Sequence, residues 1–312
     1  MDNILNSKLE KKKILRTYLA NQGWQEIITY SLISSDMKND FSVLAESEFY
    51  QLLMPKNEYH EYYRSTLIPS HLKILKYNIT YGNKDLFFFE ISSVYRPSHQ
   101  PEELLILSGI GKFWYQPLHK LVQEIDFYWL KGVLENIFEL WQIDEEISWV
   151  STSFNYLQGG AEILLAKKKI GFLGHISPSL AQKYQINDSV FMAQISLTAI
   201  FDYLNIYPPL LHYQPVSNFP FSSKDLSFIF PENIDYSQII KEIKKTADKN
   251  LQSVNVFDIY QNTELAQEKK KSVSFRLVFQ SSDRTLKNKE IEKILKDIGK
   301  RVEKVFAAKL RD

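Results

Sequence analysis

The chain has 312 residues, of which 44% are hydrophobic, 14% aromatic and 24% charged, a composition that excludes a disordered or low-complexity protein. Its 38 lysines and arginines against 37 aspartates and glutamates give a net charge of +1, which argues against a strongly basic nucleic-acid binder. The chain has no cysteine and no apolar run of about 18 residues, which excludes disulfides, thiolate metal sites and membrane helices, so we expect a cytoplasmic protein without membrane contact.

The first two hundred residues predict a domain of mixed α and β structure. Apolar residues at helical spacing indicate amphipathic helices, and short runs of aromatic and branched residues indicate buried strands. Three consecutive lysines between two apolar runs indicate the tip of a hairpin. The expected elements are helices at 8–22, 67–81 and 127–141, strands at 27–33, 86–95 and 104–112, and a hairpin that pairs 161–166 with 170–173.

A proline-rich segment at 205–220 predicts a linker between two domains, 1–204 and 221–312. It holds four of the eleven prolines, which resist both a helix and a central strand. The charge divides at the same place. The residues from Tyr213 to Asp312 include 19 basic and 14 acidic ones, a net charge of +5, whereas the preceding 212 residues have a net charge of −4. The near-neutral total therefore hides a mildly acidic domain joined to a basic one.

The last hundred residues predict the order β-α-β-β-α-β, which is the ferredoxin-like split β-α-β motif. Thr285 is expected to cap the second helix at its N-terminus. Both helices would cover one face of the sheet and leave the other face open. The expected elements are strands at 226–230, 254–260, 272–280 and 307–311, a helix at 233–249, and a long helix that follows residue 285.

Alternation along two of these strands predicts which side chains lie on the open face. Phe257 and Ile259 are expected on the helix side. The outward set is then Asp258 and Tyr260 from one strand and Ser272, Ser274, Arg276 and Gln280 from the next. An aromatic ring, a carboxylate, hydroxyls and a guanidinium suit unstacked RNA bases, and the nearby lysines 269–271 could bind phosphates. An ordinary solvent-facing sheet is also polar, so the pattern alone leaves both interpretations open.

The sequence contains none of the common catalytic signatures for phosphate binding, zinc binding or serine nucleophiles. The G-x-G at Gly109–Gly111 lacks its third glycine and is interpreted as a strand that ends in a turn. Six histidines are scattered along the chain, so no metal site is expected. Glu90, within the aromatic strand FFFEI, is interpreted as a paired structural carboxylate in preference to a catalytic acid. We therefore expect no catalytic residue in this chain.

Most of the chain resembles one family. The stretches FPFSSKDLSFIF, FDIY and KKSVSFRLVFQSSDRTL resemble the ferredoxin-fold anticodon-binding domain that ends the β subunit of bacterial phenylalanyl-tRNA synthetase. Five earlier stretches resemble the catalytic-like module of the same subunit, in the family's order. They are LRTYLANQGWQEIITYSL, RSTLIPSHLKILKYNI, LFFFEISSVY, IDFYWLKGVLENIFEL and KKIGFLGHISPSL. The resemblance implies an α+β fold, with a class II synthetase-like antiparallel sheet and helices followed by the ferredoxin-like domain.

The resemblance also implies a synthetase module that has lost its active site. Phe88 stands where the second class II motif has an arginine that binds ATP, and the third motif is not found. In the family, the α subunit activates the amino acid, and this module packs against it in an (αβ)2 assembly. We therefore expect no cofactor in this chain, and ATP and magnesium in the α subunit that is its partner.

For function, the resemblance implies a non-catalytic subunit of phenylalanine–tRNA ligase that binds the anticodon of phenylalanine tRNA. Asp258, Tyr260 and Ser272 match positions that contact the anticodon in the family, with Tyr260 stacking on a base. Chemistry alone, and not the resemblance, adds Arg276 and Arg284 as candidate RNA contacts.

Two other functions remain open at this point. Family β subunits are much longer, and the resemblance covers neither their N-terminal tRNA-binding portion, nor their editing domain, nor the segment associated with magnesium, so we expect no editing of mischarged tRNA. The chain could be a free-standing paralogue that binds RNA or regulates without a synthetase partner. It could also be a structural dimerisation scaffold, which would show no salt-dependent binding of tRNA.

Overall fold

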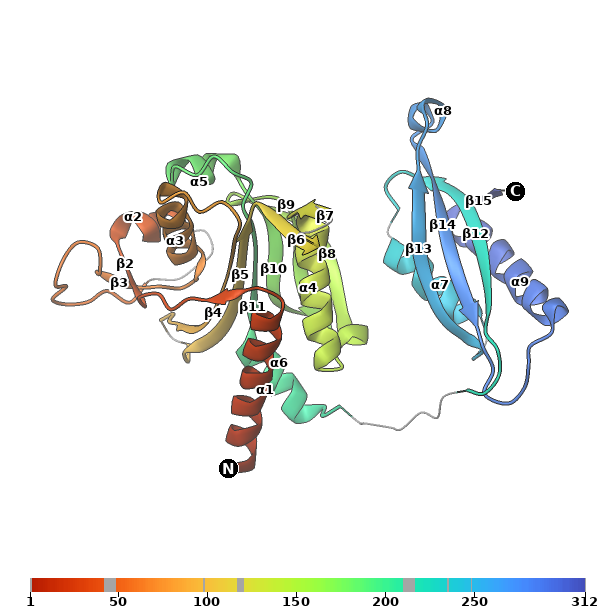
Figure 1. The fold of residues 1–312 in the computed structure, drawn as a ribbon, viewed down its shortest axis with the longest axis horizontal. Helices are drawn as coiled ribbons and strands as arrows, with labels where there is room; N and C mark the ends of the chain where they lie inside the picture. Colours follow the sequence, from red (N-terminus) through yellow and green to blue (C-terminus); the bar gives the residue numbers. More distant parts are fainter. Residues whose placement is uncertain are drawn as a thin grey trace. The chain divides into compact units, whose positions relative to one another are not determined.

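A seven-stranded sheet forms the centre of the larger of two units, residues 1–211 and 212–312, in the computed structural model of the chain (Figure 1). The structure describes residues 2–41, 49–97, 99–116, 121–209, 217–234, 236–247 and 249–311. The sheet consists of β1 Gln25–Glu26, β4 Leu86–Val94, β5 Glu102–Ile110, β8 Ile147–Phe154, β9 Leu157–Leu165, β10 Lys168–Ile176 and β11 Phe191–Ser196. Its order is β1-β4-β5-β11-β10-β9-β8, and all neighbours are antiparallel except β1 and β4.

Helices cover both faces of this sheet. The helices of this unit are α1 Asp2–Asn21, α2 Ser35–Asp40, α3 Ile68–Thr80, α4 Phe127–Leu140, α5 Pro178–Lys183 and α6 Leu197–Ile206. Figure 1 shows α3 and α5 on the left of the sheet and α4 on its right. The apolar stripes of α1, α4 and α6 pack into one core cluster with Ile163 and Ile195, and those of α3 and α5 pack into a second with Ile106 and Met192. This arrangement confirms the expected α+β class.

Shorter elements complete the larger unit. They are the pair β2 Leu32–Ile33 and β3 Tyr62–Tyr63, the pair β6 Lys112–Gln116 and β7 Leu121–Glu124, and the 3₁₀ helix η2 Asp144–Glu146. The expected helices at 67–81 and 127–141 and the strands at 86–95 and 104–112 are confirmed to within two residues. The first helix is longer than expected, since α1 begins at Asp2.

The hairpin between β9 and β10 is confirmed, and its backbone explains its tip. Lys168 pairs with Leu165, which leaves Ala166 and Lys167 as a two-residue turn. Both residues have positive φ, 47° and 70°, as a type I′ turn requires. Gly111, with φ of 91°, likewise lies between β5 and β6, so the G-x-G is a strand that ends in a turn.

The prediction of a single strand at 27–33 is wrong, because only Leu32 and Ile33 of this range lie in a strand. β1 pairs with β4 in the large sheet, whereas β2 pairs with β3 in a different one. Between them, Thr29 donates its backbone N–H and its hydroxyl to the carboxylate of Glu90, over 3.2 and 2.7 Å. The buried carboxylate of Glu90 therefore accepts the backbone hydrogen bond of Thr29 that a neighbouring strand would have accepted.

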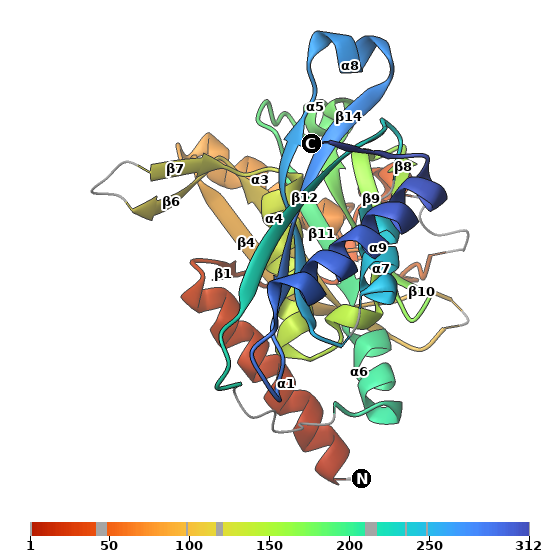
Figure 2. The same cartoon turned by 90° about the vertical axis from the view of Figure 1, so that its right-hand side faces the viewer.

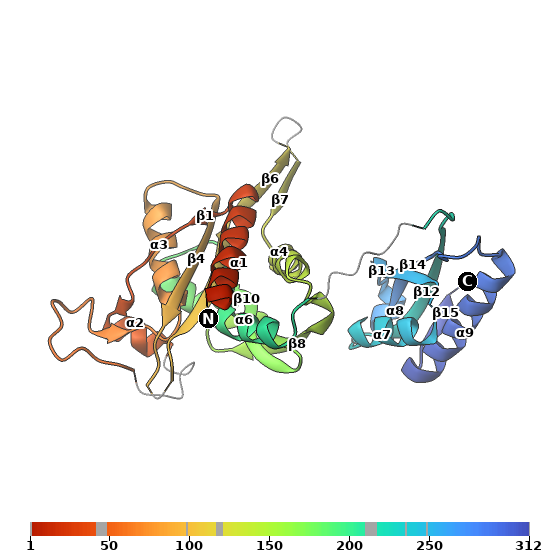
Figure 3. The same ribbon diagram turned by 90° about the horizontal axis from the view of Figure 1, so that it is seen from below.

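The smaller unit is a four-stranded sheet with two long helices on one side (Figure 3). Its elements are β12 Ser222–Pro231, α7 Tyr236–Thr246, β13 Leu251–Tyr260, α8 Thr263–Gln267, β14 Lys270–Phe279, α9 Asn288–Phe306 and β15 Lys309–Arg311. The order β13-β14-β12-β15 is antiparallel throughout. Phe228 and Phe275 of the sheet pack with Ile239 of α7 and Ile298 of α9, and all four are fully buried. The β-α-β-β-α-β order is confirmed, with α8 added between β13 and β14.

Some boundaries differ from the prediction. Thr285 is not the N-cap of α9, because the helix starts at Asn288 and its cap is Lys287. The carboxylate of Glu290 accepts the Lys287 amide over 2.9 Å and so satisfies a free donor at this end. The start of the predicted linker, 205–220, overlaps α6, which runs to Ile206, and residues 210–216 lie outside the described residues.

Candidate nucleic-acid interface

The face of the small sheet opposite α7 and α9 carries most of the side chains expected to contact RNA. In the β13–β14 register, Asp258 lies opposite Ser274 and Tyr260 lies opposite Ser272. Side chains paired in this way share a face, and so do alternate residues along a strand, such as Ser274 and Arg276. The structure therefore brings Asp258, Tyr260, Ser272 and Arg276 to one face, which we call the open face. The Tyr260 side chain is 47% exposed there.

A β-bulge in β13 corrects the expected position of Phe257. The register shifts between Val256 and Asp258, so Phe257 is the extra residue on its strand. Its ring is half exposed and lies 4.6 Å from the guanidinium carbon of Arg276, on the open face. The prediction that Phe257 faces the helices is therefore wrong, because the bulge interrupts the alternation. Phe257 instead adds a second aromatic ring to the open face.

Arg311 is part of this cluster, although no pattern in the sequence points to it. It lies on β15, opposite Ser227 of β12. Its Nη1 donates to Ser272 Oγ over 3.3 Å, and its guanidinium carbon lies 5.7 Å from the centre of the Tyr260 ring. Ser272 is only 2% exposed. The position of Arg311 beside Tyr260 and Ser272 follows only from the pairing of the short last strand, β15, with β12.

The two arginines chosen on chemical grounds both have carboxylate partners. Arg276 donates from Nε and Nη2 to the two oxygens of Asp225 on β12, over 2.9 and 2.8 Å. Arg284 follows the far end of β14 and donates to both oxygens of Glu290, over 2.8 and 2.7 Å. These hydrogen bonds from Arg284 are the main reason that the pKa of Glu290 is lowered to about 2. The structure places Arg276 on the open face but does not bring Arg284 to it.

The three lysines at 269–271 do not form one cationic flank. Lys270 has the open-face parity of β14, opposite Pro231, and forms an ion pair with Glu268 over 2.7 Å. Lys271 points to the helix side, where its Nζ lies 4.5 Å from the centre of the Tyr236 ring. Lys270 therefore flanks the open face as expected, whereas Lys271 does not.

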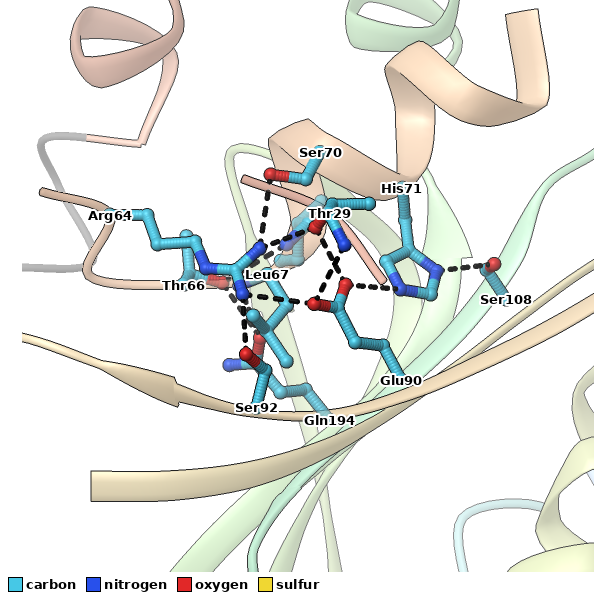
Figure 4. A network of polar contacts seen from close by, with 11 residues as sticks. Thr29, Arg64, Thr66, Leu67, Ser70, His71, Glu90, Ser92, Ser108 and Gln194 are labelled. Carbon is cyan, nitrogen blue, oxygen red and sulfur yellow. Dashed lines mark hydrogen bonds and ion pairs between the residues drawn. The ribbon is translucent and has the colours of Figure 1, made fainter. Parts of the chain in front are cut away.

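The larger unit contains a buried network of polar side chains at the face covered by α3 (Figure 4). Arg64, with no exposed surface, donates from Nη2 to Glu90 Oε1 over 2.9 Å and to Ser92 Oγ over 2.7 Å. His71 Nε2 lies 3.4 Å from Glu90 Oε2, and His71 Nδ1 lies 2.8 Å from Ser108 Oγ. Glu90 is thus surrounded by donors on both of its oxygens.

This network keeps Glu90 ionised and His71 neutral. Burial by itself raises the pKa of Glu90, but the hydrogen bond from His71, the charge of Arg64 and the Thr29 hydroxyl outweigh it and lower the pKa to about 2. Burial lowers the pKa of His71 below its ordinary value, although Glu90 opposes this effect. The structure confirms that Glu90 is a buried, paired carboxylate.

The position expected for an ATP-binding arginine is apolar. Phe88 is 3% exposed and belongs to the core cluster that contains Leu104 and Ile106. A triphosphate at this position would contact hydrocarbon instead of a cation.

Neither a metal cluster nor a membrane helix is found in the part of the chain that the structure describes. There, no group of three or more histidine, aspartate and glutamate side chains could hold a metal ion. In the same residues, no helix combines the length and the apolar character that a membrane span requires.

Comparison with known proteins covers both units. Residues 2–197 match the family described as the phenylalanyl tRNA synthetase beta chain CLM domain, and residues 217–311 match the ferredoxin-fold anticodon binding domain. The chain belongs to the phenylalanyl-tRNA synthetase β-chain family. This confirms the resemblance that the sequence motifs indicated.

Full-length relatives of this β-chain family member are much longer than the chain. The phenylalanine–tRNA ligase beta subunit of Geobacillus kaustophilus is 30% identical over 308 residues, which cover 96% of this chain and 38% of the relative. The beta subunit of Oceanobacillus iheyensis is 27% identical, and the match covers 99% of this chain and 39% of the relative. The beta subunit of Staphylococcus aureus is 29% identical, and the match covers 94% of this chain and 37% of the relative. The chain therefore spans less than two fifths of the length of these relatives.

Solved structures support a synthetase-like fold for the β-chain module. PylSc of Desulfitobacterium hafniense, a pyrrolysyl tRNA synthetase, matches with a TM-score of 0.51 and 18% identity, covering 63% of this chain and 68% of its own. A second structure of pyrrolysyl-tRNA synthetase from that organism has a TM-score of 0.51 and 17% identity, covering 64% and 69%. At this level of identity the likeness concerns the fold alone.

Proposed function

We propose that this chain is a non-catalytic, tRNA-binding part of a phenylalanine–tRNA ligase beta subunit, and that its small domain binds the anticodon of phenylalanine tRNA. One observation carries the proposal: Asp258, Tyr260 and Ser272 lie together on the open face of a domain that matches the anticodon-binding family. The net charge of +5 on the last hundred residues favours contact with RNA.

The chemistry of the open face suits an unpaired base. The half-exposed ring of Tyr260 offers a surface for stacking, and the carboxylate of Asp258 can accept hydrogen bonds from a base edge. The Ser272 hydroxyl is covered and bonded by Arg311, so a nucleotide that reaches this position either displaces the guanidinium or bonds to it. Arg276 is held by Asp225 and is less free to turn toward a phosphate.

Loss of the Tyr260 ring should weaken the binding of phenylalanine tRNA. Stacking of one base on an aromatic ring contributes about 1–3 kcal/mol, so Tyr260→Ala should raise Kd by about 5- to 150-fold. Tyr260→Phe keeps the ring and should bind nearly as well as the wild type. Filter binding of the full chain to phenylalanine tRNA measures both variants.

A matched control is available on the larger domain. Tyr128 on α4 is 76% exposed, so Tyr128→Ala removes an equally large exposed ring outside the open face. It should leave Kd unchanged. Equal affinities for the wild type and Tyr260→Ala would exclude the anticodon role of this face.

We also propose that the larger domain packs against an α subunit in an (αβ)2 assembly in the cytoplasm, and that the α subunit holds ATP and magnesium. Apolar side chains that are almost fully exposed support an interface on this domain, among them Ile28 at 91% and Met54 at 92%. Co-expression with the α subunit followed by size-exclusion chromatography should yield a complex. An Ile28→Asp and Met54→Asp double variant should weaken it, whereas separate elution of the two wild-type chains would contradict the assembly.

A further inference from the structure

We propose that the outer surface of α9 binds an RNA phosphate backbone through a row of lysines, on the opposite side of the small domain from the open face. The row, which we call the lysine stripe, consists of Lys289, Lys293, Lys296, Lys300 and Lys304. The inference deepens the proposed tRNA-binding function and rests on it only for the identity of the RNA. Figure 2 shows α9 crossing the small sheet with α7 beside it.

The spacing of the lysine stripe places its charges on one side of the helix. At 3.6 residues per turn, these five positions fall within an arc of about 80°. They lie opposite the buried positions Ile291, Ile298 and Val302, which pack on the sheet. All five lysines are exposed. Since each residue advances the helix by 1.5 Å, the row extends for about 22 Å.

The lysine stripe is not neutralised within the protein. Among the described residues, no ion pair joins any of its five lysines to a carboxylate, although α9 also contains four acidic residues. Two of these acids have other partners: Glu290 binds Arg284, and Glu303 accepts the amide of Leu310. Like charges three and four residues apart destabilise a helix by a few tenths of a kcal/mol per pair, whereas Glu292 and Asp297, which lie at the same spacings from stripe lysines, oppose this repulsion.

Helix α7 extends the same cationic surface. Lys241, Lys244 and Lys245 are exposed on it, and among the described residues they too have no ion pair with a carboxylate. An ion pair between Arg301 and Glu242 joins the two helices. Both helices of the small domain therefore carry exposed lysines that have no ion pair with a carboxylate among the described residues.

The chemistry of this surface favours a nucleic-acid backbone over an anionic membrane. A helix that lies in a membrane surface needs an apolar face beside its cations, but the apolar face of α9 is packed on the sheet, with Val305 alone among its large apolar side chains exposed. The single aromatic residue of α9, Phe306, is partly buried against the core cluster of the small domain. A row of lysines binds phosphates without reading sequence.

The salt dependence of RNA binding tests the lysine stripe directly. Each phosphate contact contributes about −0.7 to −0.9 to the slope of log K against log salt, so Lys293→Gln, Lys296→Gln and Lys300→Gln together should reduce its magnitude by about 2 to 3. Raising the salt fourfold should then weaken the wild type roughly 20- to 40-fold more than this triple variant. The full chain is titrated with phenylalanine tRNA and with an unrelated hairpin RNA, and both should show the same change.

Two control variants separate charge from side-chain identity and position. The three substitutions to arginine keep the charge and should keep the wild-type slope. Glutamine at Lys56, Lys167 and Lys168, which are exposed in the larger unit, removes the same charge elsewhere and should also keep it. Circular dichroism of each variant confirms that the helices are retained.

The outcomes distinguish this inference from the anticodon role. A reduced salt slope in the lysine variant, together with unchanged affinity in Tyr260→Ala, would support RNA binding by the lysine stripe and exclude the anticodon role of the open face. An unchanged slope in the lysine variant overturns the proposal. So does a variant that loses binding to phosphatidylserine vesicles but not to RNA, because the surface would then serve a membrane.

Discussion

Replacing Glu90 by glutamine should lower the free energy of unfolding by about 3–5 kcal/mol, because it leaves the Arg64 guanidinium buried without its counter-charge. Arg64 has no exposed surface, and Glu90 is 1% exposed. The substitution keeps the size of the side chain, so the effect reports the charge and not a cavity. Urea denaturation followed by circular dichroism measures it as a lower midpoint at an unchanged slope.

An exposed pair on the small domain gives a matched control. Asp225→Asn removes the carboxylate bonded to Arg276, but both side chains are close to half exposed, and such pairs contribute about 0–1 kcal/mol. A second variant, Glu90→Gln combined with Arg64→Met, should recover part of the loss because no buried charge remains. If Glu90→Gln and Asp225→Asn lower the stability equally, the buried network is not the stabilising feature that its geometry indicates.

The second large effect is expected at Gly171, where β10 passes β11 too closely for any side chain. A Cβ atom built at this position would lie 2.1 Å from the carbonyl oxygen of Gln194 and 2.8 Å from the Cα of Ile195. Backbone atoms cannot move aside as a flexible side chain can, so Gly171→Ala should cost about 3 kcal/mol, the upper end for an overpacked core. Thermal unfolding of the variant measures this loss.

Gly132 provides the control for the same chemical change. It lies within α4, and a Cβ atom there would meet nothing within 4 Å. Gly132→Ala should therefore stabilise the protein by up to about 1 kcal/mol, since alanine restricts the unfolded chain and favours the helix. Equal melting temperatures for the two alanine variants would show that the strands at Gly171 can separate without cost.

Local pattern was sufficient for most elements and for part of the candidate site. The stripe of α9 and the alternation of β14 follow from side-chain periodicity, which depends only on the backbone geometry of each element. Asp258 and Tyr260 were placed on the correct face for the same reason. Phe257 was not, because a β-bulge arises from how two strands pair, and a single strand's pattern carries no sign of it.

The arginines show the same division between local and tertiary information. Their charge suggested contacts with RNA, but Arg276 is held by Asp225, 51 residues away in the chain. Arg311 joins Tyr260 and Ser272 only because β15 pairs with β12. Long-range pairings of this kind have no short-range signature in the sequence.

By itself, the sequence determined the division of charge, the order of elements in the small domain, the family resemblance and the side of the sheet on which Asp258 and Tyr260 lie. These depend on composition and on periodicity along single elements. Only the tertiary structure decided that Arg64 and His71 enclose Glu90, that Arg311 covers Ser272, and that residues 27–33 do not form one strand. Each of these depends on residues far apart in the chain, which burial and hydrogen bonding bring together.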